Sequence, residues 1–210
     1  MKVLVIGANG NTGTRITGAL EKRGHEPLAM IRNQEQRAKF DAMNVPSVVG
    51  DLEHPIDDAV AGCDAVIFAA GSGGHTGKDK TVLVDHIGAI RAMVTAEVHD
   101  AHRFVMLSSL NADINSQSPI AHYHKAKGHA DHHLQNTDLD YTIVCPGRLT
   151  DEPGTGKISA SDQLFGRGYT ARENLAVALV ACLDLDNTIR KRFALLDGDT
   201  PLDQALRAIS

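Results

Sequence analysis

A tyrosine and a lysine four residues apart are the side chains of this sequence best suited to acid–base chemistry. They are Tyr123 and Lys127, in the run Tyr-His-Lys-Ala-Lys. On a helix, residues at this spacing share one face, so the phenol and the ammonium would be neighbours. A nearby positive charge lowers the pKa of a tyrosine from about 10, so the pair could exchange a proton with a substrate oxygen. A solvent-exposed pair on a polar helix is the alternative interpretation.

Two serines end an apolar run upstream of this pair. Met106 and Leu107 precede Ser108 and Ser109. Ligands of open parallel sheets bind at the carboxyl ends of the strands, so a hydroxyl here could donate a hydrogen bond to a developing oxyanion. Ser109 is the first candidate for this donor, and Ser108 is the second.

Three glycines follow the apolar run Val3–Ile6 at the spacing G-x-x-G-x-x-G. Such a turn needs glycine where the chain leaves the strand, where the backbone meets a phosphate, and where the next helix packs on the strand. The free N–H groups of that helix then face the phosphates. The pattern predicts a dinucleotide site, with a tight turn without a ligand as the alternative. The turn residues expected to bind the pyrophosphate are Gly7, Asn9, Gly10, Asn11, Thr12 and Gly13.

The end of the second predicted strand bears on the choice between NADP and NAD. It reads Ile31-Arg32-Asn33-Gln34, and the first carboxylate comes only at Glu35. An acidic residue here would bind the ribose hydroxyls of NAD, whereas an arginine accommodates the 2′-phosphate of NADP. The sequence therefore favours NADP with Arg32 at the phosphate, and NAD stays possible, because Arg32 could instead be a solvated surface residue.

Further contacts to the dinucleotide are expected after the later strands. Asp51 and Leu52 would lie near the adenine, although an aspartate in a turn is often only a local cap. The segment Ala69-Ala70-Gly71 would pass beneath the ribose and the pyrophosphate, and Ser108 would lie close to the cofactor. Lys127 could hold the hydroxyls of the nicotinamide ribose.

Short apolar runs alternate with helical patterns along all 210 residues. The predicted strands are Lys2–Ile6, Glu26–Ile31, Pro46–Val49, Ala65–Ala69, Arg103–Leu107, Tyr141–Cys145 and Arg192–Leu196. The predicted helices are Asn11–Arg23, Gln34–Ala42, Lys78–His99, Pro119–Asn136 and Arg172–Leu185. This order predicts an α/β Rossmann fold, in which a doubly wound parallel sheet carries helices on both faces. We expect a single domain over residues 1–210, with residues from about 146 to 210 on the substrate side.

Two local patterns near the C-terminal part add detail. The stretch Pro146–Phe165 is rich in Gly, Ser, Thr and Asp and is expected to form a loop beside the site. Thr170 and Glu173 have the spacing of a capping box at the start of a helix.

Composition argues against several classes of protein. The net charge of −5 disfavours binding to nucleic acid, and no apolar run is long enough to cross a membrane. The widely spaced Cys63, Cys145 and Cys182 are expected to be buried reduced thiols. Because the N-terminus has no cleavable signal pattern, a cytoplasmic location is expected. His129 and His133 could share a metal ion, but we interpret them as part of a solvated polar face, without a metal.

Together, the glycine turn, Ser109, the Tyr-x-x-x-Lys pair and the run Leu139–Gly147 resemble the atypical short-chain dehydrogenase/reductases. The similarity is to their small NAD(P)H-binding, epimerase-like and biliverdin reductase B-like group. It implies that Pro146 and Gly147 lie against the nicotinamide and that the following loop covers the substrate. Cys145 stands where this group commonly has arginine, which puts that substrate contact in doubt. The chain also lacks the C-terminal extension with which longer epimerases recognise nucleotide sugars.

The leading hypothesis is therefore an NADPH-dependent reductase of a small carbonyl compound, quinone or flavin. Tyr123 would be the proton donor, Lys127 its electrostatic partner, and Ser109 the donor to the substrate oxygen. Two alternatives stay open, namely a redox-sensing regulator that binds NADP(H) without catalysis and an NAD-dependent epimerase or dehydratase. The sequence leaves both a monomer and a homodimer possible.

Overall fold

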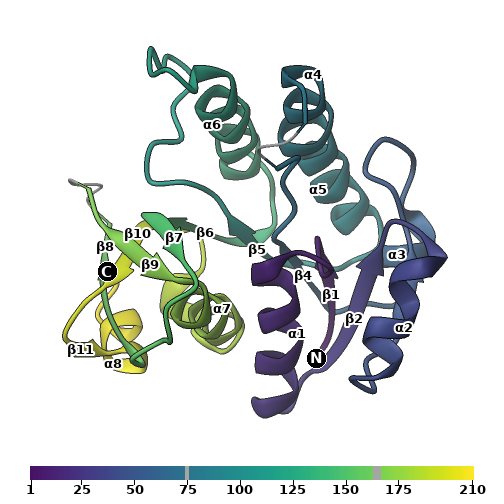
Figure 1. Cartoon of the computed structure of the whole chain (residues 1–210), viewed down its shortest axis with the longest axis horizontal. Coiled ribbons are helices and arrows are strands. Elements are labelled where there is room, and N and C mark those ends of the chain that lie inside the picture. The colour runs from purple at the N-terminus through teal and green to yellow at the C-terminus, as the bar shows by residue number, and fades with distance from the viewer. Residues whose placement is uncertain (74–75, 163–166) are drawn as a thin grey trace.

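The computed structural model describes residues 1–73, 76–162 and 167–210, and it has a central sheet with helices on both faces (Figure 1). Among these residues, nine strands form the sheet in the order β11-β8-β10-β6-β5-β4-β1-β2-β3. The neighbours from β10 to β3 run parallel, whereas β8 is antiparallel to β10 and to β11. The bounds are β1 Lys2–Ile6, β2 Glu26–Ile31, β3 Ser47–Val49, β4 Ala65–Phe68, β5 Arg103–Leu107, β6 Asp140–Pro146, β8 Lys157–Ser161, β10 Lys191–Asp197 and β11 Thr200–Pro201. β7 (Arg148–Thr150) and β9 (Tyr169–Ala171) form a separate parallel pair.

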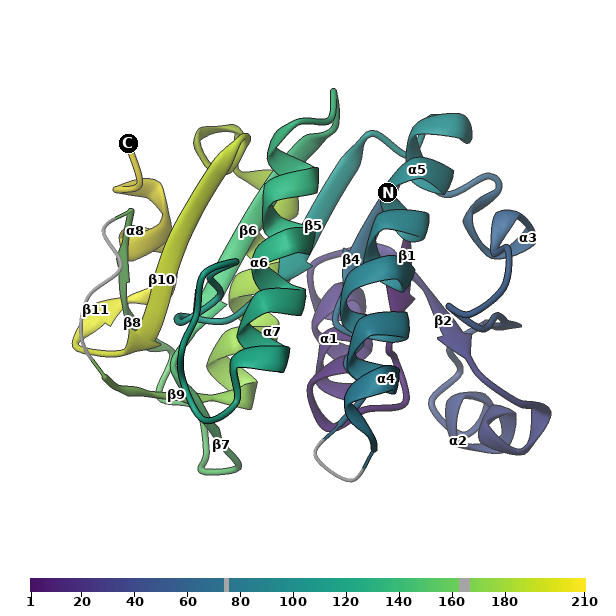
Figure 2. The same cartoon turned by 90° about the horizontal axis from the view of Figure 1, so that it is seen from above.

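The helices divide between the two faces of the sheet (Figure 2). α5 and α6 cover one face, and α1 and α7 cover the other. The α-helical bounds are α1 Asn11–Lys22, α2 Arg37–Asp41, α3 Asp57–Val60, α4 Lys78–Lys80, α5 Ala89–Val98, α6 Ala121–Gln135, α7 Arg172–Ala181 and α8 Leu202–Arg207. The predicted single-domain Rossmann fold is confirmed.

The apolar sequence of β1 explains why it lies in the interior of the sheet, between β4 and β2. Its four residues Val3–Ile6 are completely buried. Because successive side chains of a strand point to opposite faces, Val3 and Val5 join the core that includes residues of α1 and α7. Leu4 and Ile6 join the core that includes residues of α5 and α6. The strand therefore ends at the carboxyl edge between β4 and β2, where the glycine turn begins.

Most predicted elements have the expected positions. β1, β2 and β5 have the predicted bounds, β3 and β4 differ from the prediction by one residue at one end, and β6 and β10 are longer by one residue at each end. The predicted helix Gln34–Ala42 is a 3-10 turn over Gln34–Gln36 followed by α2. The predicted helix Lys78–His99 contains a π-helical segment, Thr81–Gly88, between α4 and α5.

Two predictions near the C-terminal part are wrong. The stretch expected to be a loop contains β7 and β8, and β8 was missed because only Ile158 of its five residues is buried. The capping box is also absent, since α7 has no side-chain cap. The Thr170 hydroxyl donates to the Leu195 carbonyl instead, and the Glu173 carboxylate accepts the Gly154 N–H.

Buried thiols and a buried arginine complete the core. Cys63, Cys145 and Cys182 are buried and free in the described chain, as expected. Burial raises the pKa of the Cys145 and Cys182 thiols to about 12 and raises the pKa of Cys63. The Arg103 guanidinium donates hydrogen bonds to the carbonyls of Asp140 and Cys182, and these bonds stabilise its buried charge.

We expect Ellman's reagent to label none of the three thiols within minutes at pH 8 in the folded protein. The Cys145 and Cys182 thiols, with a pKa of about 12, are ionised on the order of once in 10⁴ molecules at that pH, and burial blocks the reagent at all three cysteines. After unfolding in guanidinium, all three cysteines should react. Rapid labelling of the folded protein would contradict the burial described here.

Candidate functional site

The turn after β1 is held by two very close backbone approaches. Gly7 has a φ of +86°, and a Cβ at this position would lie 2.6 Å from the Ala70 nitrogen. A Cβ on Gly13 would lie 2.1 Å from the Gly7 carbonyl oxygen. Only glycine therefore lets α1 pack this closely on the end of β1. Because α1 begins at Asn11 without a side-chain cap, its first N–H groups are left for an anionic ligand.

A first cavity of about 320 Å³ lies beside this turn. The predicted residues that line it are Gly7, Asn9, Gly10, Arg32, Asp51, Leu52, Ala69, Ala70 and Gly71. Its wall also includes Glu53 and Lys80, whose side chains form an ion pair of 2.5 Å. The sequence analysis missed this pair because its members are far apart in the chain. Asp51 accepts the Glu53 N–H at 3.0 Å, so it also acts as the local cap considered above.

A second cavity of about 420 Å³ adjoins the first. The predicted residues Ser108, Tyr123 and Lys127 line it, together with Asp85 and His122, which the sequence analysis did not single out. Residues 69–72 line both cavities. A ligand that extends from one cavity to the other would therefore cross this segment.

Lys127 is buried at the second cavity, with only 2% of its surface exposed. Its Nζ donates to the Leu107 carbonyl oxygen at 3.0 Å and lies 3.7 Å from Asp85 Oδ1. Burial raises the pKa of Tyr123 above its ordinary value, whereas the Lys127 charge lowers it and the Asp85 charge raises it. The lowering expected from Lys127 is thus present, but burial outweighs it.

Behind the second cavity, Ser108 belongs to a buried polar chain. Its hydroxyl donates to Asp131 Oδ2 at 2.7 Å, and Arg192 Nε donates to the same oxygen at 3.1 Å. Burial raises the pKa of Asp131, while the Ser108 hydrogen bond and the Arg192 charge lower it. Since its proton is engaged, Ser108 presents lone pairs to the cavity. Ser109, the first candidate, is not among the described residues that line either cavity.

Pro146 and Gly147 also lie outside the described lining of both cavities. The Gly147 N–H donates to the Leu195 carbonyl at 3.3 Å and to the Thr170 hydroxyl at 3.1 Å. A Cβ on Gly147 would lie 2.3 Å from the Gly168 carbonyl oxygen. Close backbone packing therefore accounts for this glycine, and the expected contact with a nicotinamide stays a prediction.

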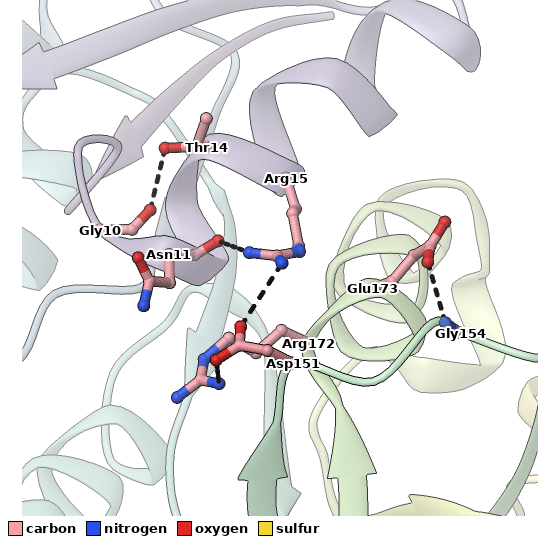
Figure 3. A network of polar contacts seen from close by, with 8 residues as sticks. All are labelled: Gly10, Asn11, Thr14, Arg15, Asp151, Gly154, Arg172 and Glu173. Carbon is pink, nitrogen blue, oxygen red and sulfur yellow. Dashed lines mark hydrogen bonds and ion pairs between the residues drawn. The ribbon is translucent and has the colours of Figure 1, made fainter.

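Ion pairs connect the start of α1 with the C-terminal part of the chain (Figure 3). Asp151 Oδ2 lies 2.9 Å from Arg172, and Asp151 Oδ1 lies 3.4 Å from Arg15. Arg15 in turn donates to the Asn11 carbonyl oxygen at 2.7 Å. Asn11 and the buried Thr12, both expected at the pyrophosphate, are the first residues of α1. Neither belongs to the described lining of the two cavities. Because these ion pairs are partly exposed, they contribute little stability.

Lys39, on α2, is a basic residue that the sequence analysis missed. Its Nζ donates to the Asn9 carbonyl at 3.1 Å, to the Asn9 side chain at 3.2 Å and to the Thr14 hydroxyl at 2.7 Å. Burial lowers the pKa of Lys39. The sequence contained no signal for this contact, because Lys39 is one of several charged residues of a polar helix. With Arg32, it gives the glycine turn two positive neighbours.

The histidines of α6 do not assemble a metal site in the described chain. His129 stacks on His86 with ring centroids 4.9 Å apart. No group of three or more His, Cys, Asp or Glu side chains among the described residues is placed to hold a metal ion. Across the same residues, every helix is too short or too polar to span a bilayer.

Comparison with known proteins agrees with this geometry. Residues 7–186 match the family described as NAD(P)H-binding. The chain is 42% identical to the uncharacterized sugar epimerase YhfK of Bacillus subtilis over 215 aligned residues that cover both proteins completely.

Two solved structures are similar over nearly their whole length. One, described as an NAD-dependent epimerase/dehydratase of Bacillus halodurans, has a TM-score of 0.94 and 41% identity, with 98% of each chain covered. The other, the oxidoreductase ylbE of Lactococcus lactis, has a TM-score of 0.87 and 29% identity, with 100% of this chain and 96% of the other covered. Since the family match spans most of the chain and these relatives align from end to end, the chain belongs to the NAD(P)H-binding family of atypical short-chain dehydrogenase/reductase-like proteins.

Proposed function

We propose that this protein is an NADPH-dependent reductase of a small carbonyl compound, quinone or flavin. One observation carries the proposal: the buried Lys127 and the phenol of Tyr123 line a cavity that shares a wall with the cavity at the glycine turn. A dinucleotide bound at the turn could thus place its reactive end beside a proton donor. Reduction of a polar double bond needs this arrangement.

The residues of the first cavity fit the adenosine half and the pyrophosphate of a dinucleotide. The backbone approaches at Gly7 and Gly13 leave room for phosphates at the start of α1. Arg32 lines the cavity, and Lys39 lies against Asn9 of the same turn. Two cations beside the turn favour a 2′-phosphate, so we infer a preference for NADP over NAD.

In the proposed mechanism, the bound nicotinamide supplies a hydride, and this chain supplies a proton and the electrostatic environment of the reacting groups. Tyr123 donates its phenolic proton to the substrate oxygen. Lys127 stabilises the phenolate that results, because its ammonium lies one helical turn away on α6. Ser108 replaces Ser109 as the serine that we place beside the substrate, because it lines the second cavity, and Asp131 fixes its hydroxyl.

A second candidate is an NAD(P)-dependent epimerase or dehydratase, and the descriptions of the Bacillus subtilis and Bacillus halodurans relatives above favour it. In such an enzyme the same tyrosine would accept a proton during a transient oxidation. The dinucleotide would be regenerated in each cycle, so the purified protein should retain it.

The test combines binding with turnover. Calorimetric titrations with NADPH and NADH should show tighter binding of NADPH. A panel of carbonyl compounds, quinones and flavins should then reveal consumption of NADPH at 340 nm. Binding without consumption would support a redox-sensing regulator instead, and protein purified with retained dinucleotide would support the epimerase.

Replacing Tyr123 with phenylalanine should lower turnover by about 10²–10⁴-fold, because the proton donor is lost while the ring is kept. The affinity for NADPH should stay within about threefold of the wild type. Tyr169→Phe is the matched control, since Tyr169 is 60% exposed on β9 and lines neither cavity within the described chain. Unchanged turnover of the Tyr123 variant would remove the proposed proton donor.

Replacing Arg32 with alanine should raise the Kd for NADPH by about tenfold or more, because a charge-assisted hydrogen bond to phosphate contributes about 1.5–3 kcal/mol. The Kd for NADH should change by less than about twofold. Arg37→Ala serves as the control, because the Arg37 guanidinium bonds to Gln34 on the surface of the same segment. An equal loss of affinity for NADPH and NADH would contradict a 2′-phosphate site at Arg32.

A further inference from the structure

Asp85 is a buried carboxylate with one oxygen still open to a partner. It lies in the π-helical segment Thr81–Gly88, is completely buried, and lines the second cavity. Its Oδ2 accepts the Ser72 N–H at 2.9 Å. Its Oδ1 has no hydrogen-bond partner among the described residues and lies 3.7 Å from Lys127 Nζ.

An unsatisfied buried acceptor destabilises the folded protein, and a charged acceptor does so more than a neutral one. Lys127 reduces this destabilisation through its charge, but the 3.7 Å separation is too long for a direct hydrogen bond. A ligand that donates to Asp85 Oδ1 would satisfy it. The same ligand could accept from Lys127, whose ammonium has three donors and uses one for the Leu107 carbonyl.

The backbone at Gly71 lies directly against this oxygen. A Cβ on Gly71 would lie 3.2 Å from Asp85 Oδ1, so a side chain at position 71 would press against the carboxylate. Gly71 and Ser72 belong to the wall shared by the two cavities. A group bound between Asp85 and Lys127 therefore lies at the junction of the cavities, past the glycine turn.

An acceptor and a donor side by side suit a pair of adjacent hydroxyls, one donating to the carboxylate and the other accepting from the ammonium. We propose that Asp85, together with Lys127, binds the ribose diol of the nicotinamide half of the dinucleotide. This inference rests on the proposed function and adds Asp85 as a further binding residue. The carboxylate also holds residues 71 and 72 through the Ser72 N–H, so the diol and the shared wall are positioned by the same side chain.

The test uses Asp85→Asn, which keeps an acceptor for the Ser72 N–H but turns an amide toward Lys127. Titration calorimetry should show that the Kd for NADPH rises about tenfold. The Kd for adenosine 2′,5′-bisphosphate, which reaches the first cavity only, should stay within about twofold. If Asp85 only maintained the shared wall, the variant would bind both ligands more weakly and to a similar extent, and that result would overturn the proposal.

Asp64→Asn is the matched control, because this carboxylate also accepts a backbone N–H, from Lys2 at 2.6 Å, at the opposite edge of the sheet. Should Asp85→Asn fail to fold, Gly71→Ala is the second variant, because it crowds the same oxygen and leaves the charge of Asp85 in place. It should raise the Kd for NADPH more than the Kd for the bisphosphate.

These outcomes separate the two proposals. Equal NADPH affinity in the wild type and the Asp85 variant would refute the diol contact but leave the reductase proposal intact. Selective loss of NADPH affinity, in a protein that reduces nothing on the panel, would support the diol contact and refute the reductase. A wild type that binds neither dinucleotide would refute both.

Discussion

The glycine turn after β1 constrains the rest of this structure, because three segments meet there with only backbone between them. Gly7 lies against Ala70 at the end of β4, and Gly13 lies against Gly7 from the first turn of α1. A methyl group at either position would force α1 or β4 away from β1. The first cavity and its open helix N-terminus both depend on this contact.

Buried charge at the carboxyl edge of the sheet is the second constraint. The Lys127–Asp85 and Arg192–Asp131 pairs each leave one carboxylate oxygen without a hydrogen bond among the described residues. Such pairs are weak contributors to stability, since desolvation offsets most of their attraction. Their place at and behind the second cavity gives a better reason for their presence. Under the proposed function, a site that moves protons benefits from charges that water does not screen.

Relatives that share this fold are described with different activities, including a sugar epimerase and an oxidoreductase. The common features are a dinucleotide turn and a sheet edge, and these alone do not select one reaction. Under the proposed function, the choice depends on a few side chains at the second cavity. Two of its lining side chains, Ser108 and Asp85, are hydrogen-bonded to residues of other segments, Asp131 on α6 and Ser72 after β4.

The sequence by itself determined the elements whose residues are uniformly apolar and the turn whose glycines are close together. β1, β2 and β5 could be predicted to the residue, and so could the role of Gly7 and Gly13, because these signals are local. The strand β8, which lies between β11 and β10, could not be predicted, since only one of its residues is buried.

Tertiary structure alone decided which polar groups meet at the site. Lys39 reaches Asn9 across 30 residues, and Lys127 lies beside Asp85 from another helix. The choice of Ser108 over Ser109 follows from which side of the chain faces the cavity. Parallel strands bring segments that are distant in the sequence to one edge of the sheet. A contact between such segments therefore has no characteristic spacing in the sequence and cannot be predicted from it.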